Sequence, residues 1–140
     1  MKIISFNHLN KDCLEQAFQI RKAVFMEEMN VSSEDEFEFD DESTHYLLFD
    51  SNKAIACSRW RVTENGIKLE RFAVLKSHRS KGLGGMILKH MLDELIPTKK
   101  YIYLNAQIEA KDFYLQRGFV KKGEEFMEAG IKHVKMEYRY

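Results

Sequence analysis

Two apolar segments with different periods meet in the middle of the chain, and they predict a strand followed directly by a helix. Phe72 to Leu75 is a short continuous apolar run, typical of a buried strand. From Leu83 to Leu95 apolar side chains recur every four residues, with charged side chains opposite, which indicates a helix with one buried face. The polar and glycine-bearing residues between them predict a loop that leads straight into the helix.

The remaining pattern predicts an ordered series of strands and helices. Asn65-Gly66 between two β-rich runs indicates a hairpin turn, and Pro97 is expected to stop the long helix. A strand, helix and strand around Pro97 predict a parallel crossover. The fold class is therefore mixed α/β, with strands at 2–6, 45–49, 54–62, 67–75, 99–106, 119–126 and 131–138, and helices from Asn10 or Asp12 to Met29, from the glycine loop to Pro97, and at 109–117.

Composition limits the classes of protein to consider. The chain has 140 residues, 44% of them hydrophobic and 31% charged, which predicts one soluble globular domain spanning 1–140. Lys plus Arg and Asp plus Glu both number 22, so no net field favours nucleic acid or a membrane surface. No apolar run is long enough for a signal peptide or a membrane span, and we expect a cytoplasmic protein.

The two cysteines do not suggest a reactive site. Cys13 and Cys57 lie far apart in a predicted helix and a predicted strand, without the spacing of a metal or redox site. We interpret both as buried structural thiols and expect no bound metal.

The loop before the long helix has the properties of an anion site. Arg79, Lys81 and the three glycines at 82, 84 and 85 fall where the helix begins, so free backbone N–H groups and two cations meet with little side-chain bulk. Phosphate is the most natural ligand. The order of residues fits neither a Walker loop nor a dinucleotide fingerprint. A glycine-rich helix start can also serve a purely steric purpose.

What the loop does resemble is motif A of the GNAT superfamily of N-acetyltransferases, Arg/Gln-x-x-Gly-x-Gly/Ala, with Arg79, Gly82 and Gly84 in the key positions. Lys76 departs from the proline common there, which changes the stiffness of the loop and leaves its glycines intact. Further segments resemble the ElaA/YjcF-like branch of this superfamily, and together they cover nearly the whole chain: Arg21 to Phe25, Asp41 to His45, Leu104-Asn-Ala-Gln107, Phe113-Tyr-Leu-Gln-Arg-Gly-Phe119 and Phe126-Met-Glu-Ala-Gly-Ile-Lys-His-Val-Lys-Met136.

The resemblance implies the GNAT fold, a mixed and mostly antiparallel central sheet flanked by helices. It also implies acetyl-coenzyme A as co-substrate, without a metal. The pyrophosphate would lie on Arg79, Ser80, Lys81, Gly82, Leu83, Gly84 and Gly85. The pantetheine arm would run beside the backbone of Phe72, Ala73 and Val74, with the amide of Asn105 or Gln107 as a further partner. Core packing of the strand and turn capping by the amides are the alternative interpretations.

Acetyl transfer needs a neutral amine, a polarised thioester carbonyl and a proton donor for the departing thiolate. The resemblance assigns the donor role to Tyr114, although a buried aromatic residue near a helix end would look the same in sequence. Candidates for the base are Glu70, His133 and His45. Glu70 can instead form an ion pair with Arg71, the histidines can be structural, and a water chain can replace a dedicated base.

An acidic segment, Glu34 to Glu42, interleaves seven carboxylates with Phe37 and Phe39. Such a run is most often a solvated loop. It can also be an acidic wall that attracts a cationic amine, with the two aromatic rings anchoring it.

The leading hypothesis is an N-acetyltransferase that moves acetyl from acetyl-CoA to a primary amine of a small molecule or peptide. We expect no nucleic-acid partner and no membrane, and a monomer or homodimer. Two alternatives keep the fold without the reaction: a non-catalytic acyl-CoA sensor and an interaction module.

Overall fold

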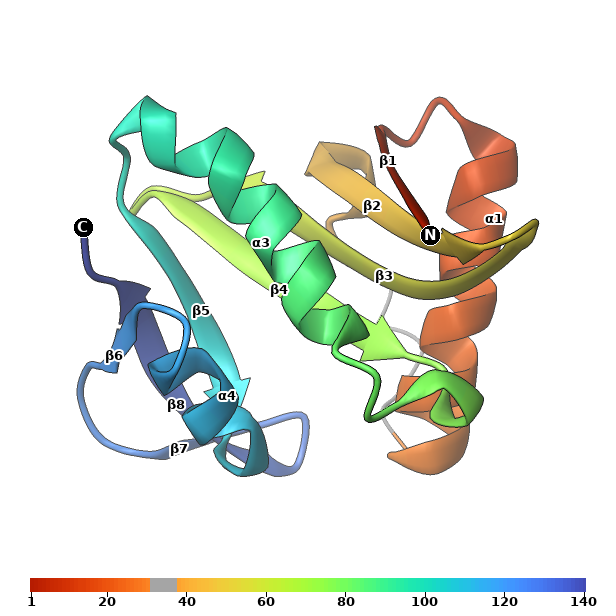
Figure 1. Cartoon of the computed structure of the whole chain (residues 1–140). Coiled ribbons are helices and arrows are strands. Elements are labelled where there is room, and N and C mark those ends of the chain that lie inside the picture. Colours follow the sequence, from red (N-terminus) through yellow and green to blue (C-terminus); the bar gives the residue numbers. More distant parts are fainter. Residues whose placement is uncertain (31–37) are drawn as a thin grey trace.

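A twisted eight-stranded sheet forms the centre of the molecule (Figure 1). The computed structural model describes residues 1–30 and 38–140. Neighbouring strands follow the order β1-β2-β3-β4-β5-β8-β6, and β7 pairs with β8 outside this path. The strands are β1 (Lys2–Phe6), β2 (Ser43–Asp50), β3 (Lys53–Val62), β4 (Ile67–Val74), β5 (Ile102–Gln107), β6 (Phe119–Lys121), β7 (Phe126–Glu128) and β8 (Ile131–Tyr138).

Helices cover both faces of this sheet. In Figure 1, α3 crosses the front of β4 and α1 lies behind the strands. The α3 face packs its apolar stripe on the larger core, while α1 closes a smaller core with Phe25, Leu47 and Cys57. The helical elements are α1 (Lys11–Arg21), η1 (Lys22–Glu28), η2 (Asp40–Glu42), η3 (Lys76–His78), α3 (Leu83–Leu95), η4 (Ile96–Thr98), η5 (Ile108–Ala110) and α4 (Lys111–Leu115).

The predicted meander and crossover are confirmed. β2, β3 and β4 pair antiparallel in sequence order, whereas β4 and β5 are parallel and joined through α3. Six apolar residues of α3 are buried, as its four-residue period requires, and Pro97 lies in the short turn that ends it. Asn65-Gly66 closes a four-residue loop, in which Thr63 and Gly66 exchange backbone hydrogen bonds, rather than a two-residue turn.

The parallel pair separates after three register pairs, which end at Leu69 and Leu104. Figure 1 shows β4 and β5 side by side at the upper left and diverging below. β4 also carries a bulge, because the pairing with β3 shifts between Cys57 and Arg59, and Arg71 has a φ of 59°. Because the backbone of Arg71 is in the left-handed conformation, β4 bends at this residue and the residues after it turn away from β5.

Two predicted elements differ from the structure. The first helix does not continue in one form to Met29, because its last turns, Lys22–Glu28, are wound as a π-helix. The predicted strand 119–126 is broken into β6 and β7. Gly123 lies between them with a φ of 85°, a conformation that interrupts an extended strand.

The acidic segment is described from Glu38 onward, and its residues 34–37, including Phe37, lie outside the described residues. Glu38 and Phe39 line a cavity next to β4, and both interpretations of the segment stay predictions. Asp40 is buried, accepting hydrogen bonds from Arg21 at 2.7 and 2.9 Å and from Arg59 at 2.7 Å. Phe39 lies under the guanidinium of Arg61, 3.9 Å from its ring centroid. Asp41 and Glu42 are exposed. The segment is therefore fixed to the sheet at Asp40.

The thiol prediction holds for Cys57, which is buried, while Cys13 is only partly buried, and the two thiols do not form a disulfide bond with each other. In residues 1–30 and 38–140 no helix is long and apolar enough to cross a membrane.

Candidate active site

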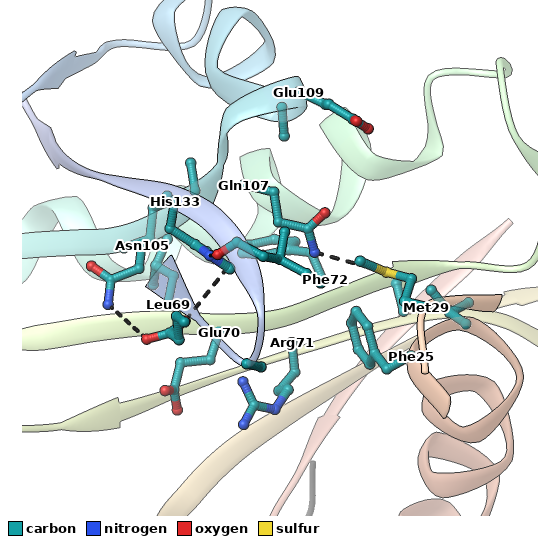
Figure 2. A pocket seen from close by; sticks show the side chains of 18 of the residues that line it. Phe25, Met29, Leu69, Glu70, Arg71, Phe72, Asn105, Gln107, Glu109 and His133 are labelled. Atoms are coloured by element: carbon teal, nitrogen blue, oxygen red, sulfur yellow. Dashed lines mark hydrogen bonds and ion pairs between the residues drawn. The ribbon is translucent and has the colours of Figure 1, made fainter. Parts of the chain in front are cut away.

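A cavity of about 710 Å³ fills the space where β4 and β5 separate. β4 contributes its bulge and the residues after it, and β5 contributes Asn105 to Gln107 on the opposite wall. Residues from η1, β3, η5, α4 and the β7–β8 hairpin, together with Glu38 and Phe39, complete the lining. Figure 2 shows Phe72 and Gln107 facing each other across this space, with Phe25 and Met29 on one side. Strand separation thus creates a slot with exposed backbone groups on its walls.

Arg79 lines one end of the slot, four residues before the start of α3. Gly82 forms the N-cap with a φ of 75°, and no side chain caps the first turn of this helix. Its first amide N–H groups therefore remain available, and the helix dipole favours an anion there. A β-carbon at Gly84 would contact the Phe113 ring at 3.6 Å, whereas one at Gly85 would crowd the Arg117 guanidinium at 3.1 Å.

Arg79 lies at this end in a fixed position. Its Nε donates to the carbonyl oxygen of Val74 at 2.9 Å, and its two terminal nitrogens donate to both carboxylate oxygens of Glu28 at 2.9 and 2.8 Å. The hydrogen bonds from Arg79 lower the pKa of Glu28. Glu28 belongs to η1, so the pair links the glycine loop to the helical segment across the slot.

A second hollow of about 520 Å³ lies beside the start of α3. It shares Gly82 and Gly85 with the loop and includes the cations Lys89 and Arg117. Arg117 is oriented by a hydrogen bond to the carbonyl oxygen of Phe113 at 2.9 Å and stacks on that ring. The helix start therefore has a hollow on each side.

Tyr114 lines the slot from α4 and is buried. Its ring packs edge-on against Phe72, Phe113 and Phe119, with centroid distances of 6.1, 5.0 and 5.7 Å. Burial raises the pKa of the Tyr114 hydroxyl, and Arg117 offsets only part of this effect. The hydroxyl stays protonated at neutral pH and can donate a proton.

Asn105 and Gln107 both line the slot from β5 (Figure 2). The Asn105 amide donates to Glu128 Oε1 at 3.3 Å, and the Gln107 amide contacts the sulfur of Met29 at 3.8 Å. The weak partner of Gln107 is one that a stronger acceptor can replace.

Glu70 lines the slot, and its ion-pair partners among the described residues are Arg59, Arg61 and Lys68 in place of the Arg71 pair that the sequence suggested. Arg59 and Arg61 approach its Oε1 at 3.0 and 2.9 Å, and Lys68 approaches its Oε2 at 3.2 Å. Burial would raise the pKa of Glu70, but Arg59, Lys68 and Arg61 together lower it. A carboxylate held in this way is a weak proton acceptor.

His133 is buried and faces the slot from β8. Its Nδ1 lies 2.7 Å from the carbonyl oxygen of Ile131. Because a carbonyl oxygen only accepts, Nδ1 carries the proton, and in the neutral ring Nε2 keeps a lone pair. The Oε2 atom of Glu128 lies 3.6 Å from Nε2. Glu128 was not among the predicted site residues, because its contacts come from β5 and β8, 23 and 5 positions away.

The third candidate base, His45, is not in the slot. It is fully buried in β2, where Nε2 donates to the carbonyl oxygen of Asp40 at 2.9 Å and the ring stacks on Phe6. Burial lowers its pKa despite the Asp40 carbonyl and carboxylate, so the ring is neutral. His45 is a packing residue of the sheet.

The predicted site residues form two adjoining groups. Those that line the slot are Glu70, Phe72, Ala73, Val74, Arg79, Asn105, Gln107, Tyr114 and His133. Those of the loop follow Arg79 and lead into α3, outside the lining of the slot: Ser80, Lys81, Gly82, Leu83, Gly84 and Gly85. Within the described part of the chain, no group of three or more His, Cys, Asp or Glu side chains could hold a metal ion.

Comparison with known proteins shows the family of the chain. Residues 9–140 match the family described as acetyltransferase (GNAT) domain. YjcF of Bacillus subtilis (strain 168), described as an uncharacterized N-acetyltransferase, is 41% identical over 130 residues, which cover 91% of this chain and 93% of YjcF.

Two crystal structures share the fold at low sequence identity. An acyl-CoA N-acyltransferase from Pseudomonas aeruginosa superposes with a TM-score of 0.88 at 21% identity, covering 99% of each chain. Escherichia coli ElaA superposes with a TM-score of 0.86 at 23% identity, covering 99% of this chain and 100% of ElaA.

Proposed function

The chain belongs to the GNAT acetyltransferase family, in its ElaA/YjcF-like branch, and from this premise we propose that it transfers acetyl from acetyl-CoA to a primary amine of a small molecule. The observation that carries the proposal is the continuity of the slot. It runs from Arg79, next to the uncapped helix start, past the separated backbone of β4 to Tyr114 and His133. An anion site, an extended backbone edge and a proton donor thus lie along one path.

Acetyl-CoA has parts that suit each stretch of this path. Its pyrophosphate suits the free amides of α3 and the cation Arg79, with the nucleotide end directed toward the hollow that contains Lys89 and Arg117. Its pantetheine arm carries amides that can pair with the free edge of β4 at Phe72 to Val74. The thioester would then lie near Tyr114.

The proposed reaction consists of deprotonation of the amine, attack on the thioester and protonation of the leaving thiolate. The acceptor arrives as an ammonium ion and loses one proton to His133 Nε2, which passes it to solvent. The neutral nitrogen attacks the thioester carbonyl carbon, the C–N bond forms, and the C–S bond breaks. Tyr114 gives its proton to the departing thiolate and regains one from the new amide nitrogen through water.

Of the predicted bases, His133 suits this step better than Glu70. The Nε2 lone pair of His133 faces the slot, whereas the cations around Glu70 lower its pKa. Glu70 then holds Arg59 and Arg61 in place rather than moving protons.

The test combines acetyl-CoA binding by calorimetry with thiol release across a panel of small amines and lysine peptides. We expect binding, and thiol release with at least one small amine. Binding without release would favour an acyl-CoA sensor, and absence of binding would favour an interaction module.

Gly84→Val probes the phosphate site within the same experiment. The added side chain is tolerated by the fold, because the contact with Phe113 is at ordinary van der Waals distance, but it covers the helix amides. We expect acetyl-CoA affinity to fall about tenfold or more, with an unchanged melting temperature of the free protein. Unchanged affinity in a folded Gly84→Val protein would contradict the phosphate site.

A further inference from the structure

The β7–β8 hairpin brings a carboxylate to the slot in a defined position. Glu128 ends β7, and the two turn residues Ala129 and Gly130 both have positive φ, 50° and 75°. This is the conformation of a type I′ turn, which usually has Asn or Gly where Ala129 stands. The tight turn sets Glu128 opposite Ile131, so its side chain reaches the slot beside His133.

Residues of β5, β7 and β8 hold the Glu128 carboxylate and the His133 imidazole in fixed positions next to each other. Asn105 of β5 donates to Oε1 of Glu128, which orients the carboxylate and leaves Oε2 toward His133. The ring of His133 is held by the Ile131 carbonyl on one edge and by stacking on Phe126 at 6.0 Å. Glu128 Oε2 and His133 Nε2 are thus two acceptors 3.6 Å apart, too far for a direct hydrogen bond.

One donor group can satisfy both acceptors at once. A nitrogen at about 2.9 Å from each atom would bridge them, and an ammonium ion carries the N–H bonds to do so. The carboxylate adds charge to one of these hydrogen bonds. Three cations of the slot have other carboxylate partners, because Arg79 is paired with Glu28, and Arg61 and Lys68 are paired with Glu70.

We propose that Glu128 and His133 bind the acceptor as a protonated primary amine, with Glu128 holding the charge and His133 taking the proton. This inference rests on the proposed function and specifies its acceptor class. The acceptor is a small aliphatic amine, cationic at neutral pH, because the coenzyme arm takes up part of the 710 Å³ slot. After proton transfer to Nε2, the Glu128 hydrogen bond keeps the nitrogen in place, and its lone pair is free to attack.

Two probe amines separate charge from shape. Benzylamine is an ammonium ion at neutral pH, whereas aniline is a neutral amine of similar shape. In Glu128→Gln we expect the KM for benzylamine to rise about tenfold or more, as for loss of a charged hydrogen bond, with the KM for acetyl-CoA and the aniline kinetics unchanged. Glu125→Gln is the matched control, because Glu125 is an exposed carboxylate that precedes the same hairpin and pairs only loosely with Lys132 at 3.7 Å.

A binding measurement without acetyl-CoA keeps this inference distinct from the proposed function. The NMR signal of the His133 imidazole should shift on benzylamine titration in the native protein and in Glu125→Gln, and not in Glu128→Gln. A shift without thiol release would overturn the acetyl transfer and leave the amine site standing. No shift in the native protein, or equal benzylamine KM values in native protein and Glu128→Gln, would overturn the amine site.

Discussion

At the residue scale, Tyr114 combines a ring that is packed among aromatic side chains with a position that lines the slot. Three phenylalanine rings surround its ring, so its orientation is set by packing, and it still lines the slot. Burial raises its pKa, so the hydroxyl does not ionise at neutral pH. The hydroxyl therefore keeps its proton until negative charge develops on the departing sulfur in the transition state.

Tyr114→Phe should therefore reduce turnover by roughly 10²–10⁴-fold with almost no change in acetyl-CoA affinity. The phenylalanine ring keeps the aromatic packing. Among the described residues the hydroxyl forms no hydrogen bond, so stability should change by only about 0.5 kcal/mol. Stopped-flow thiol release, calorimetry and thermal unfolding on one preparation check the three statements. Native turnover in this variant would make Tyr114 a packing residue.

Sequence reasoning worked best for residues whose role is local. The glycines at 82 and 84 could be placed because a helix start needs only its neighbours, and Tyr114 could be placed by resemblance. Glu128 could not, because Asn105 and His133 meet it only after three strands align. For the same reason, the sequence could not distinguish His45 from His133 as a candidate base. Nothing in the sequence separates a histidine buried in β2 from one that faces the slot.

At the element scale, the Arg79–Glu28 pair ties η1 to the loop before α3. Both side chains are about one-third exposed, at 39% and 34%, so solvent weakens the pair and a competing anion can displace Glu28. A pyrophosphate group would have to share or displace Glu28 to reach the same guanidinium. Glu28 also places a negative charge beside an anion site.

Glu28→Gln should consequently bind acetyl-CoA more tightly, by up to about fivefold at low salt. The gain should shrink as salt screens the removed charge. Glu27→Gln is the control, because Glu27 is an exposed carboxylate in the preceding position. Calorimetric titrations at two ionic strengths measure the difference. Weaker binding in Glu28→Gln would mean that Glu28 orients Arg79 for the coenzyme instead of competing with it.

Element boundaries followed the hydrophobic pattern wherever packing alone decides them. α3 and the meander were predicted because one periodic face is buried in each. The π-helical turns of η1 and the bulge at Arg71 have no such pattern, since both are imposed by neighbouring elements. Gly123 is a local signal for the break between β6 and β7. The apolar residues around it nevertheless favoured the prediction of one continuous strand.

At the scale of the whole molecule, one chain of buried charges connects α1 and η2 to the central sheet. It runs from Arg21 in α1 through Asp40 and Arg59 to Glu70 in β4. Asp40 lies between two arginines that are 1% and 0% exposed. Removal of a single member leaves an uncompensated charge in the interior, which costs far more than a surface ion pair does.

Asp40→Asn should thus lower the free energy of unfolding by about 3–5 kcal/mol, a large part of what a domain of this size has. Asp41→Asn, next to it and exposed, should change it by less than about 0.5 kcal/mol. Urea unfolding of both variants gives the comparison, and equal midpoints would contradict the role of Asp40. Tests of the acidic segment for amine attraction must leave Asp40 intact.

Glu70, the last member of this chain of charges, makes the free energy of unfolding depend on pH in acid. The pKa of Glu70 is lowered in the folded protein, so its stabilising contribution is present above its unfolded value and lost as the pH falls through the folded value. Unfolding midpoints should therefore fall on acidification below about pH 4.5, the ordinary pKa of a glutamate.

The early separation of β4 and β5 divides the sheet into two halves with only three shared register pairs, Ile67–Leu69 with Ile102–Leu104. One half is the meander, and the other is β5 with the C-terminal strands. A ligand that pairs with the free edge of β4 would act as an additional strand across this seam. Amide hydrogens of Phe72 to Val74 and of Asn105 to Gln107 should then exchange with solvent more slowly, although no residue of the protein has changed its partner. The coenzyme would complete the sheet as well as supply the acetyl group.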